Sequence, residues 1–261
     1  MERMLYEANH LRGYDLTGID GAIGKVREFY FDDRFWTVRY LASDSGDWLE
    51  GRQVLLSPRA LVCVDPAVRC IRMDLARKQI EDSPHLSDEM PIDRQFEDDY
   101  HGYYGWEKYW SGPYMWGVGD YPSAAASPYH AFEFTEQKSE LENRTPWGSS
   151  LHGTHDVSGH RIQALDGEIG HVVDFLLDEE TWAIRYLVVD TRNLWPGKRI
   201  LIAPRWIDRV SWSETKVFVD LPRETIRNAP EYTDGCPVDR TYEAALHDYY
   251  RRQGYWVDEG K

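Results

Sequence analysis

The sequence predicts a mainly β protein that consists of two tandem copies of one small β-barrel, each followed by a short helical tail. Three observations support this prediction. The chain repeats itself at an offset of about 146 residues. Short runs of β-branched and aromatic residues alternate in polarity with a period of two, and Gly or Pro residues stand at the ends of these runs. We expect the two barrels to pack as a pseudo-twofold pair within one chain.

The repeat is visible without a gap. Gly13 aligns with Gly159 and Tyr104 with Tyr250, and about 30 of about 90 aligned positions are identical. The chain therefore divides into a first module with its tail, a linker, and a second module with its tail, at residues 11–106, 107–153 and 154–256.

The linker is rich in Gly, Pro, Ser and aromatic residues and has no sustained period of 2 or 3.6. It differs from a flexible Gly/Ser linker because its aromatic side chains carry a large apolar area. We expect some of the aromatic side chains in this stretch and at its start to dock on the modules: Trp106, Trp110, Tyr114 and Trp116.

Each module contains five or six predicted strands within about 65 residues, which favours a small closed barrel without exposed sheet edges. The sequences "DDRF" and "DEET" separate two strand-like runs and predict hairpin turns with acidic side chains in solvent. Gly24 and Gly170 fit a bulge or turn with a positive φ near the start of a strand. Pro58 and Pro204 end a later strand, because proline cannot donate to a ladder.

The helical tails follow the strands. "RKQIEDSP" and "RETIRNAP" predict one or two helical turns that a proline stops. "DRTYEAALHDYYRRQ" predicts a longer helix whose cap is Asp239 or Thr241. The first copy, "DRQFEDDYHGYYGW", has glycines where the second has helix formers, so we expect its helix to be shorter or frayed.

The order of these elements resembles that of the PRC-barrel family. The likeness is carried by "DGEIGHVVDFLLDEETWAIRYLVVDT", "GKRILIAP" and "PVDRTYEAALHDYY" in the second copy, and by "DGAIGKV", "FDDRFWTVRYL", "VLLSPRAL" and "YYGW" in the first. That family includes the cytoplasmic domain of the photosynthetic reaction-centre H subunit and the C-terminal domain of a ribosome maturation factor. The resemblance implies a protein-binding module rather than a catalyst.

Composition limits the classes of partner. The 261 residues have a net charge of −15, which opposes binding to nucleic acid and to anionic lipid. We find no apolar run of the roughly 20 residues that a membrane-spanning helix needs, and no signal peptide, so we expect a cytoplasmic protein without direct membrane insertion. Cys63, Cys70 and Cys236 form no CxxC pair and suggest neither a disulfide framework nor a zinc site.

Six residues are candidates for contact with a partner protein because they recur at equivalent positions in the two copies. Two are the arginines of the "RYL" strands, and four are tyrosines near the end of the tails: Arg39, Arg185, Tyr103, Tyr104, Tyr249 and Tyr250. For the arginines, an ion pair inside the module is the ordinary alternative. For the tyrosines, packing of the helix on the barrel is the alternative.

A second recurring set is the Glu–His pair, Glu97 with His101 and Glu243 with His247, at i, i+4 spacing on the predicted helices. Such a pair could serve in general acid–base catalysis. A structural role is favoured, because no nucleophile motif and no phosphate-binding loop accompanies it. We therefore predict no catalytic residues and no enzyme activity.

Metal binding is weighed at two places and predicted at neither. The stretch "HGTHDVSGH" has enough ligands for a metal, but its spacing suits no regular element. The acidic hairpin turns, for their part, match no calcium-loop spacing, and a solvated face is favoured. No metal and no cofactor are expected.

These inferences lead to one expected function and two alternatives. The expected function is a non-catalytic protein-interaction or assembly module built from two PRC-barrels, present as a monomer with pseudo-twofold symmetry or as a homodimer. The first alternative is an accessory factor, peripheral to the membrane, of a photosynthetic or electron-transfer complex. The second is a protein that binds a small ligand in the cleft between the modules.

Overall fold

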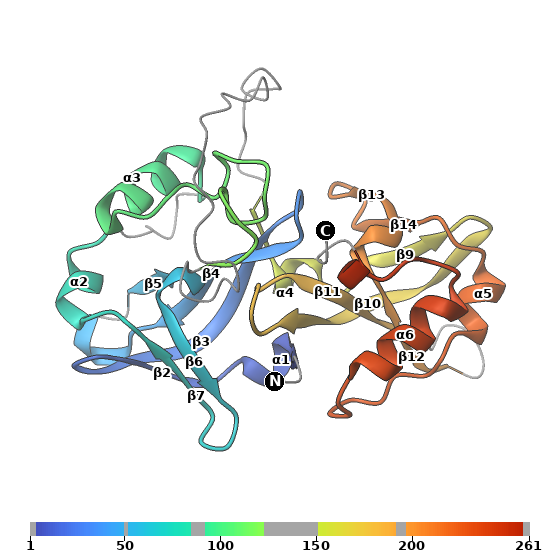
Figure 1. Cartoon of the computed structure of the whole chain (residues 1–261), viewed down its shortest axis with the longest axis horizontal. Helices are drawn as coiled ribbons and strands as arrows, with labels where there is room; N and C mark the ends of the chain where they lie inside the picture. The colour runs from blue at the N-terminus through green and yellow to red at the C-terminus, as the bar shows by residue number, and fades with distance from the viewer. Residues whose placement is uncertain (1–3, 50–51, 85–91, 123–150, 192–196, 258–261) are drawn as a thin grey trace. The chain divides into compact units, whose positions relative to one another are not determined.

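The computed structural model describes residues 4–49, 52–84, 92–122, 151–191 and 197–257 (Figure 1). The chain forms two compact units. The first-copy unit is Leu11–Gly153 with Glu180–Ala183, and the second-copy unit is Met1–His10, Thr154–Glu179 and Ile184–Lys261. Both units are mainly β, and each has one seven-stranded sheet.

In the first-copy unit the strands lie in the order β5-β4-β3-β2-β7-β6. The bounds are β2 (Asp15–Gly18), β3 (Gly21–Asp32), β4 (Thr37–Asp44), β5 (Gln53–Leu56), β6 (Leu61–Asp65) and β7 (Cys70–Met73). All pairs are antiparallel except β2 with β7, which is parallel. A seventh strand, β8 (Leu151–Gly153), pairs with the far end of β3.

The second-copy unit repeats this order as β12-β11-β10-β9-β14-β13. The bounds are β9 (Arg161–Ala164), β10 (Gly167–Asp178), β11 (Ile184–Asp190), β12 (Arg199–Ile202), β13 (Ile207–Ser211) and β14 (Lys216–Val219). Its seventh strand is β1 (Leu5–Glu7), which pairs with β10.

The two short seventh strands show a reciprocal exchange. β1 and the one-turn helix α1 (Ala8–Leu11) precede the first copy in sequence, yet β1 pairs with β10 of the second. At the same repeat positions, β8 and α4 (Thr154–Val157) precede the second copy, and β8 pairs with β3 of the first. Each sheet is therefore completed by the segment that leads into the other copy.

A closed barrel, which the strand count favoured, is not found in the part of the chain that the structure describes. No ladder there joins β5 to β6 or β12 to β13, so each sheet path has two ends. At some points, residues outside the sheet form hydrogen bonds with an end strand in place of a neighbouring strand. For example, Tyr232 donates its backbone N–H to the carbonyl of Arg199 on the outer side of β12.

The glycines at the start of the long strands behave as predicted. Gly24 and Gly170 have φ values of 155° and 151°, and the ladder with the preceding strand shifts register beside each of them. A Cβ atom would lie 1.9 Å from the carbonyl oxygen of Asp44 at the first position and 2.2 Å from that of Asp190 at the second. Only glycine allows the backbone to approach this closely.

The acidic hairpin turns differ from the expectation of solvated carboxylates. Asp32 and Asp178 are only 3% and 0% exposed. Asp32 accepts hydrogen bonds from the backbone N–H groups of Arg34 and Phe35 at 3.1 and 2.8 Å, so its carboxylate holds the turn from inside. A carboxylate can be buried when it accepts hydrogen bonds from backbone N–H groups and from an arginine. The spacing of residues in the sequence did not reveal this arrangement.

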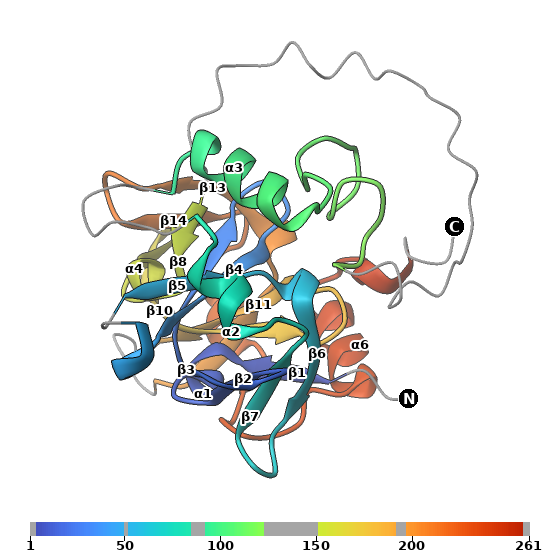
Figure 2. The same ribbon diagram turned by 90° about the vertical axis from the view of Figure 1, so that its left-hand side faces the viewer.

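The tail helices are α2 (Arg77–Glu81) and α3 (Arg94–Tyr104) in the first-copy unit (Figure 2), and α5 (Arg223–Asn228) and α6 (Arg240–Tyr249) in the second. Asp93 and Asp239 cap α3 and α6 by accepting the backbone N–H three residues later. The expectation of a shorter first helix was wrong, since α3 has 11 residues and α6 has 10.

The physical reason is the position of the glycines. Gly102 lies on the exposed side of α3, and Gly105 ends the helix in the left-handed conformation at φ 67°. The buried side carries Tyr100, whose hydroxyl donates to the carbonyl of Leu55 on β5 at 2.8 Å. Tertiary packing of this face outweighs the low helix propensity of one glycine.

The docking of linker aromatics is confirmed for Trp116, which is 1% exposed and donates its indole N–H to the carbonyl of Thr181 at 2.9 Å. Trp106 stacks on Tyr104 at 4.4 Å. In the second-copy unit the corresponding indole comes from Trp206, which lies 4.4 Å from Tyr250. The two copies thus fill a similar place in the core from different points in the chain.

Candidate functional site

The "RYL" arginines form buried ion pairs with the hairpin aspartates. Arg39 donates from Nε to Oδ2 of Asp32 at 2.7 Å, and Arg185 makes the same bond to Asp178 at 2.7 Å. The exposed fractions of the two arginine side chains are 0% and 8%. β3 and β10 end at the aspartates, while β4 and β11 carry the arginines, so each ion pair closes one hairpin.

Aromatic rings cover these arginines. The guanidinium carbon of Arg39 lies 4.0 Å from the ring centre of Tyr109 and 4.6 Å from that of Trp116. The corresponding carbon of Arg185 lies 3.8 Å from the ring of Tyr255. The prediction that Arg39 and Arg185 contact a partner is therefore corrected, because both guanidinium groups are enclosed by their own copy.

The Glu–His pair of the first copy belongs to a buried hydrogen-bonded cluster, the Tyr–Glu–His cluster. The hydroxyl of Tyr40 on β4 lies 3.1 Å from Oε1 of Glu97 and 3.2 Å from Nε2 of His101, both on α3. Tyr109 donates to Glu97 at 2.6 Å. Nδ1 of His101 donates to the carbonyl oxygen of Glu107 at 3.0 Å.

The second copy builds the same cluster. Tyr186 lies 3.0 Å from Oε1 of Glu243 and 3.0 Å from Nε2 of His247. Tyr255 donates to Glu243 at 2.8 Å, and Nδ1 of His247 donates to the carbonyl oxygen of Gln253 at 3.1 Å. The repeat thus preserves both the residues and the bonding pattern.

Burial determines the protonation preferences in the first cluster. Desolvation, together with the positive charge of the nearby Arg59, lowers the pKa of His101 to about 4. Desolvation also raises the pKa of Glu97, against the opposing effect of Arg94, whose Nη1 lies 2.9 Å from Oε2 of the carboxylate. Burial shifts the pKa values of His247 and Glu243 in the same directions.

The bonding pattern identifies the tautomer. A carbonyl oxygen only accepts, so Nδ1 of His101 carries the proton and Nε2 is the acceptor for Tyr40. The single hydroxyl proton of Tyr40 then faces two acceptors when Glu97 is ionised. A proton on Glu97 would relieve this competition; burial raises the pKa of that carboxyl group, whereas Arg94, 2.9 Å from its Oε2, opposes the shift.

These side chains connect the tail helix to the sheet. Glu97 and His101 are 0% and 1% exposed, and their polar contacts are to other groups of the same copy. A general acid–base pair needs a path to a substrate. The geometry instead fits a structural connection between α3 and β4, and its repetition indicates that both copies use it.

The two buried histidines are expected to contribute an acid-sensitive component to the stability of the fold. Between pH 6.5 and about 4 the unfolded chain binds a proton at His101 that the folded protein does not, so the free energy of unfolding decreases as the pH falls. At about 1.4 kcal/mol per pKa unit, the lowered pKa of His101 reduces the free energy of unfolding by about 3 kcal/mol at low pH. The lowered pKa of His247 reduces it further.

The measurement is urea unfolding at pH 7 and pH 4 for the natural chain and for His101→Gln. Glu97 has the opposite pH dependence because its pKa is raised, so the histidine contribution is read from the difference between the two proteins. The stability advantage of the natural chain over His101→Gln should shrink toward pH 4. An advantage of equal size at both pH values would contradict the assignment.

The four candidate tyrosines separate into two pairs. Tyr103 and Tyr249 are 43% and 36% exposed, and their hydroxyls donate to the carbonyls of Gln79 and Thr225 at 2.9 and 2.8 Å. Tyr250 is 5% exposed, and Tyr104 is half-buried. The structure therefore leaves the rings of Tyr103 and Tyr249 accessible and uses the other two for packing.

The described residues contain no group of three or more His, Cys, Asp or Glu side chains that could hold a metal ion. In the histidine-rich stretch, Nε2 of His152 lies 3.4 Å from Oδ2 of Asp33, and the centre of its ring lies 6.0 Å from that of Phe31. His160 lies 5.9 Å from the ring of Trp212. None of the helices described is long and apolar enough to span a membrane.

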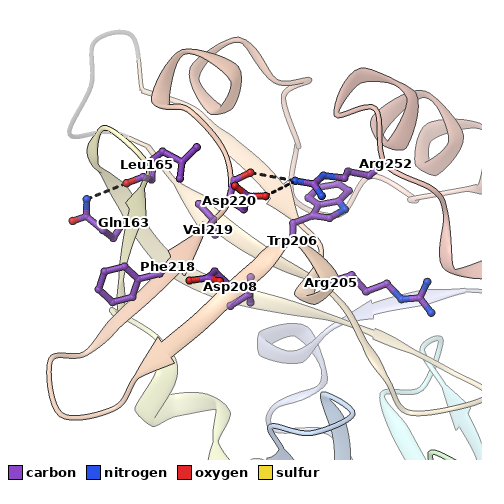
Figure 3. Close-up of a pocket in the computed structure, with 11 residues that line it drawn as sticks. Gln163, Leu165, Arg205, Trp206, Asp208, Phe218, Val219, Asp220 and Arg252 are labelled. Carbon is purple, nitrogen blue, oxygen red and sulfur yellow. Dashed lines mark hydrogen bonds and ion pairs between the residues drawn. The ribbon is translucent and has the colours of Figure 1, made fainter.

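A surface pocket of about 630 Å³ lies in the second-copy unit (Figure 3). Its lining comes from β9, β13, β14, the 3₁₀ helix Pro204–Trp206, the residues directly after β9 and β14, and one residue after α6: Gln163, Ala164, Leu165, Arg205, Trp206, Ile207, Asp208, Phe218, Val219, Asp220 and Arg252. Figure 3 shows Gln163 and Arg205 at opposite ends.

The pocket combines apolar and charged groups. Leu165 is 66% exposed, and the ring of Phe218 lies 3.5 Å from the guanidinium carbon of Arg209. Arg252 donates to the carboxylate of Asp220 at 3.1 Å (Figure 3). Aromatic and arginine side chains around an exposed aliphatic group are typical of the centre of protein interfaces.

Sequence reasoning missed the pocket and the aromatic rings that lie over the buried arginines Arg39 and Arg185. Tyr109 and Trp110 align with Tyr255 and Trp256 at the same offset as the rest of the repeat, so extending the comparison beyond Tyr104 would have found this cover. The pocket left no such signal. At two of the pocket positions the second copy has Phe218 and Asp208, where the first copy has Arg72 and Val62. Neither difference indicates a pocket until the fold is known.

A scan of protein-family models and a search of curated proteins match nothing in this chain.

Proposed function

We propose that this chain is a non-catalytic protein-interaction or assembly module. The observation that carries the proposal is the pocket around Leu165, where an exposed aliphatic side chain stands beside Phe218, Trp206 and two arginines. Burying apolar side chains of this kind provides most of the free energy of protein association. The clusters that could have supported catalysis are instead enclosed within each copy.

The repeat supports the same proposal. Ile19, the counterpart of Leu165, is 67% exposed, and Val62, the counterpart of Asp208, is 61% exposed. An exposed aliphatic residue therefore precedes the Asp–Gly turn in both copies. A repeated exposed apolar position suits binding to another molecule better than it suits stability of the isolated chain.

The proposal includes the PRC-barrel assignment and the arrangement of the copies as a pseudo-twofold pair. Support comes from the element order, which is the same in both copies, and from the reciprocal use of β1 and β8. The partner is another protein, and the chain acts either as a monomer or as a homodimer.

The test is affinity capture of tagged full-length chain from its native host, read by mass spectrometry, with Leu165→Asp and Ile19→Asp as variants. These positions have nearly equal exposure, and only Leu165 lines the pocket. A stoichiometric partner that is lost with Leu165→Asp supports the proposal. A capture without any stoichiometric partner, or with one that neither variant affects, contradicts it.

A further inference from the structure

Three adjacent strands of the second-copy unit share a small outer surface, the basic face. β14 pairs with β9 on one side and with β13 on the other (Figure 1). Side chains alternate along a strand, so the register places six residues on this face in two rows: Arg161, Lys216 and Ser211, and then Gln163, Phe218 and Arg209. Ile162 and Val217, which lie between the rows, are 0% exposed and point to the core.

The basic face carries three cations, and two of them have no anionic partner among the residues that the structure describes. Arg161 lies 3.4 Å from Glu168 in an exposed ion pair. Within the described part of the chain, neither Lys216 nor Arg209 forms an ion pair. Because the whole chain has a net charge of −15, a face with unpaired cations indicates a site for an anionic group.

The positive charge is specific to the second copy. The register of β2, β7 and β6 places these six residues at the corresponding positions of the first copy: Asp15, Thr17, Cys63, Asp65, Cys70 and Arg72. The formal charge of the six positions is therefore +3 in the second copy and −1 in the first. Both copies form the same strand order, so the fold of the repeat does not require the cations.

The spacing of the unpaired cations limits the kind of anion. Lys216 lies opposite Ser211, and Arg209 precedes Ser211 by two residues, so the two cations stand at diagonal positions. The Cα atoms of diagonal neighbours are about 7–8 Å apart. In an extended chain, side chains two residues apart point to the same side at a spacing of about 6.6 Å. Two carboxylates at alternate positions of an extended segment therefore match Lys216 and Arg209.

The aromatic ring on the basic face argues against nucleic acid as the ligand. Proteins that bind single strands stack bases on exposed aromatic rings. The guanidinium carbon of Arg209 lies 3.5 Å from the ring centre of Phe218, so the guanidinium group already covers a face of that ring. The net negative charge of the chain also repels a phosphate backbone. A short acidic segment of a protein is therefore favoured.

The basic face adjoins the pocket. Phe218 and Gln163 belong to both, and Figure 3 shows them near each other at one end of the pocket. Leu165, which is 66% exposed, lines the same pocket. An aliphatic side chain of a bound segment can cover this apolar surface while carboxylates of the same segment reach the cations. The carboxylate of Asp208, which also lines the pocket, disfavours an acidic residue at that end.

We propose that the basic face and the pocket together bind an extended acidic segment of a partner protein, with an aliphatic residue beside two carboxylates at alternate positions. The inference rests on the proposed function and specifies the chemistry of the partner. The carboxylates pair with Lys216 and Arg209, and the aliphatic side chain packs against Leu165.

The probe is the synthetic peptide Ser-Leu-Thr-Asp-Thr-Asp-Thr-Ser with blocked termini, in which threonine favours an extended backbone. It is titrated into the ¹⁵N-labelled full-length chain to about 2 mM, which detects a dissociation constant in the millimolar range by NMR chemical shifts. We expect the largest shifts at residues 161–165 and 207–219. A peptide with asparagine in place of both aspartates should bind about fivefold more weakly or worse, because two exposed ion pairs are lost.

Matched variants locate the contact. The double variant Lys216→Glu/Arg209→Glu should weaken binding by about tenfold or more, because like charges then face the carboxylates. Leu165→Asp should also weaken it, and Asp208→Asn should strengthen it. Arg72→Glu, which reverses the cation on the corresponding face of the first copy, should leave binding unchanged. Circular dichroism checks the fold of each variant, and Lys216→Gln/Arg209→Gln is the second variant if charge reversal disturbs it.

Failure of this inference is distinguishable from failure of the proposed function. The inference is overturned if the peptide causes no shifts, if the asparagine peptide binds equally well, or if the shifts lie in the first copy. Tighter binding of a single-stranded RNA oligonucleotide to the same strands also overturns it. If a natural partner is nevertheless captured and then lost with Leu165→Asp, the proposed function stands, and only the chemistry assigned to the partner is wrong.

Discussion

Arg39→Ala is expected to destabilise the first-copy unit by about 3–5 kcal/mol, the usual cost of removing one partner of a buried ion pair. The substitution leaves the carboxylate of Asp32, whose side-chain exposure is 4%, without its arginine. It also leaves a gap at the rings of Tyr109 and Trp116, which lie against the guanidinium group of Arg39. Urea unfolding followed by circular dichroism measures the loss, and hydrogen exchange shows which unit is affected.

Arg34→Ala is the control, because this arginine lies exposed in the same turn and its backbone bond to Asp32 does not involve the side chain. It should change the free energy of unfolding by less than about 0.5 kcal/mol. The double variant Asp32→Asn/Arg39→Met should recover part of the loss, since no unpaired charge is then buried. An Arg39→Ala protein as stable as Arg34→Ala would refute this account of the hairpin.

The second large effect is expected from the removal of residues 1–7, which deletes β1. The unit that should suffer is the second-copy unit, although the deleted residues precede the first copy. Tyr6 is 9% exposed, and Glu7 accepts from the backbone N–H of Gly235 at 2.8 Å and from the hydroxyl of Tyr232. The lost burial of Tyr6 alone is worth about 1.5–3 kcal/mol.

Hydrogen exchange is the measurement, because it reports on each strand separately. The amides of β10 near Leu176 and Leu177 should lose protection, and those of β3 near Tyr30, which pairs with β8, should keep it. A synthetic peptide of residues 1–10, added in trans, should restore protection on β10 by strand addition. Loss of protection on β3 instead, or on neither strand, would show that β1 does not complete the second sheet.

The sequence by itself determined the duplication and most of the local structure. Identities at one offset located both copies, and the positive φ of Gly24 and Gly170 followed from their place at the start of a strand. The stops at Pro84 and Pro230 and the cap at Asp239 were also readable, because each depends on neighbours within a few residues. The length of the first tail helix could not be predicted in this way, because the packing of Tyr100 outweighed the low helix propensity of the glycines in that helix.

Only the tertiary structure decided which repeated polar residues are internal. Arg39 and Tyr103 recur equally well in the sequence, but burial separates an ion pair enclosed by aromatic rings from an exposed tyrosine. The exchange of β1 and β8 and the pocket at Leu165 depend on contacts between residues far apart in the chain. A single sequence carries no periodicity or spacing that records such contacts, because they arise when the strands pair.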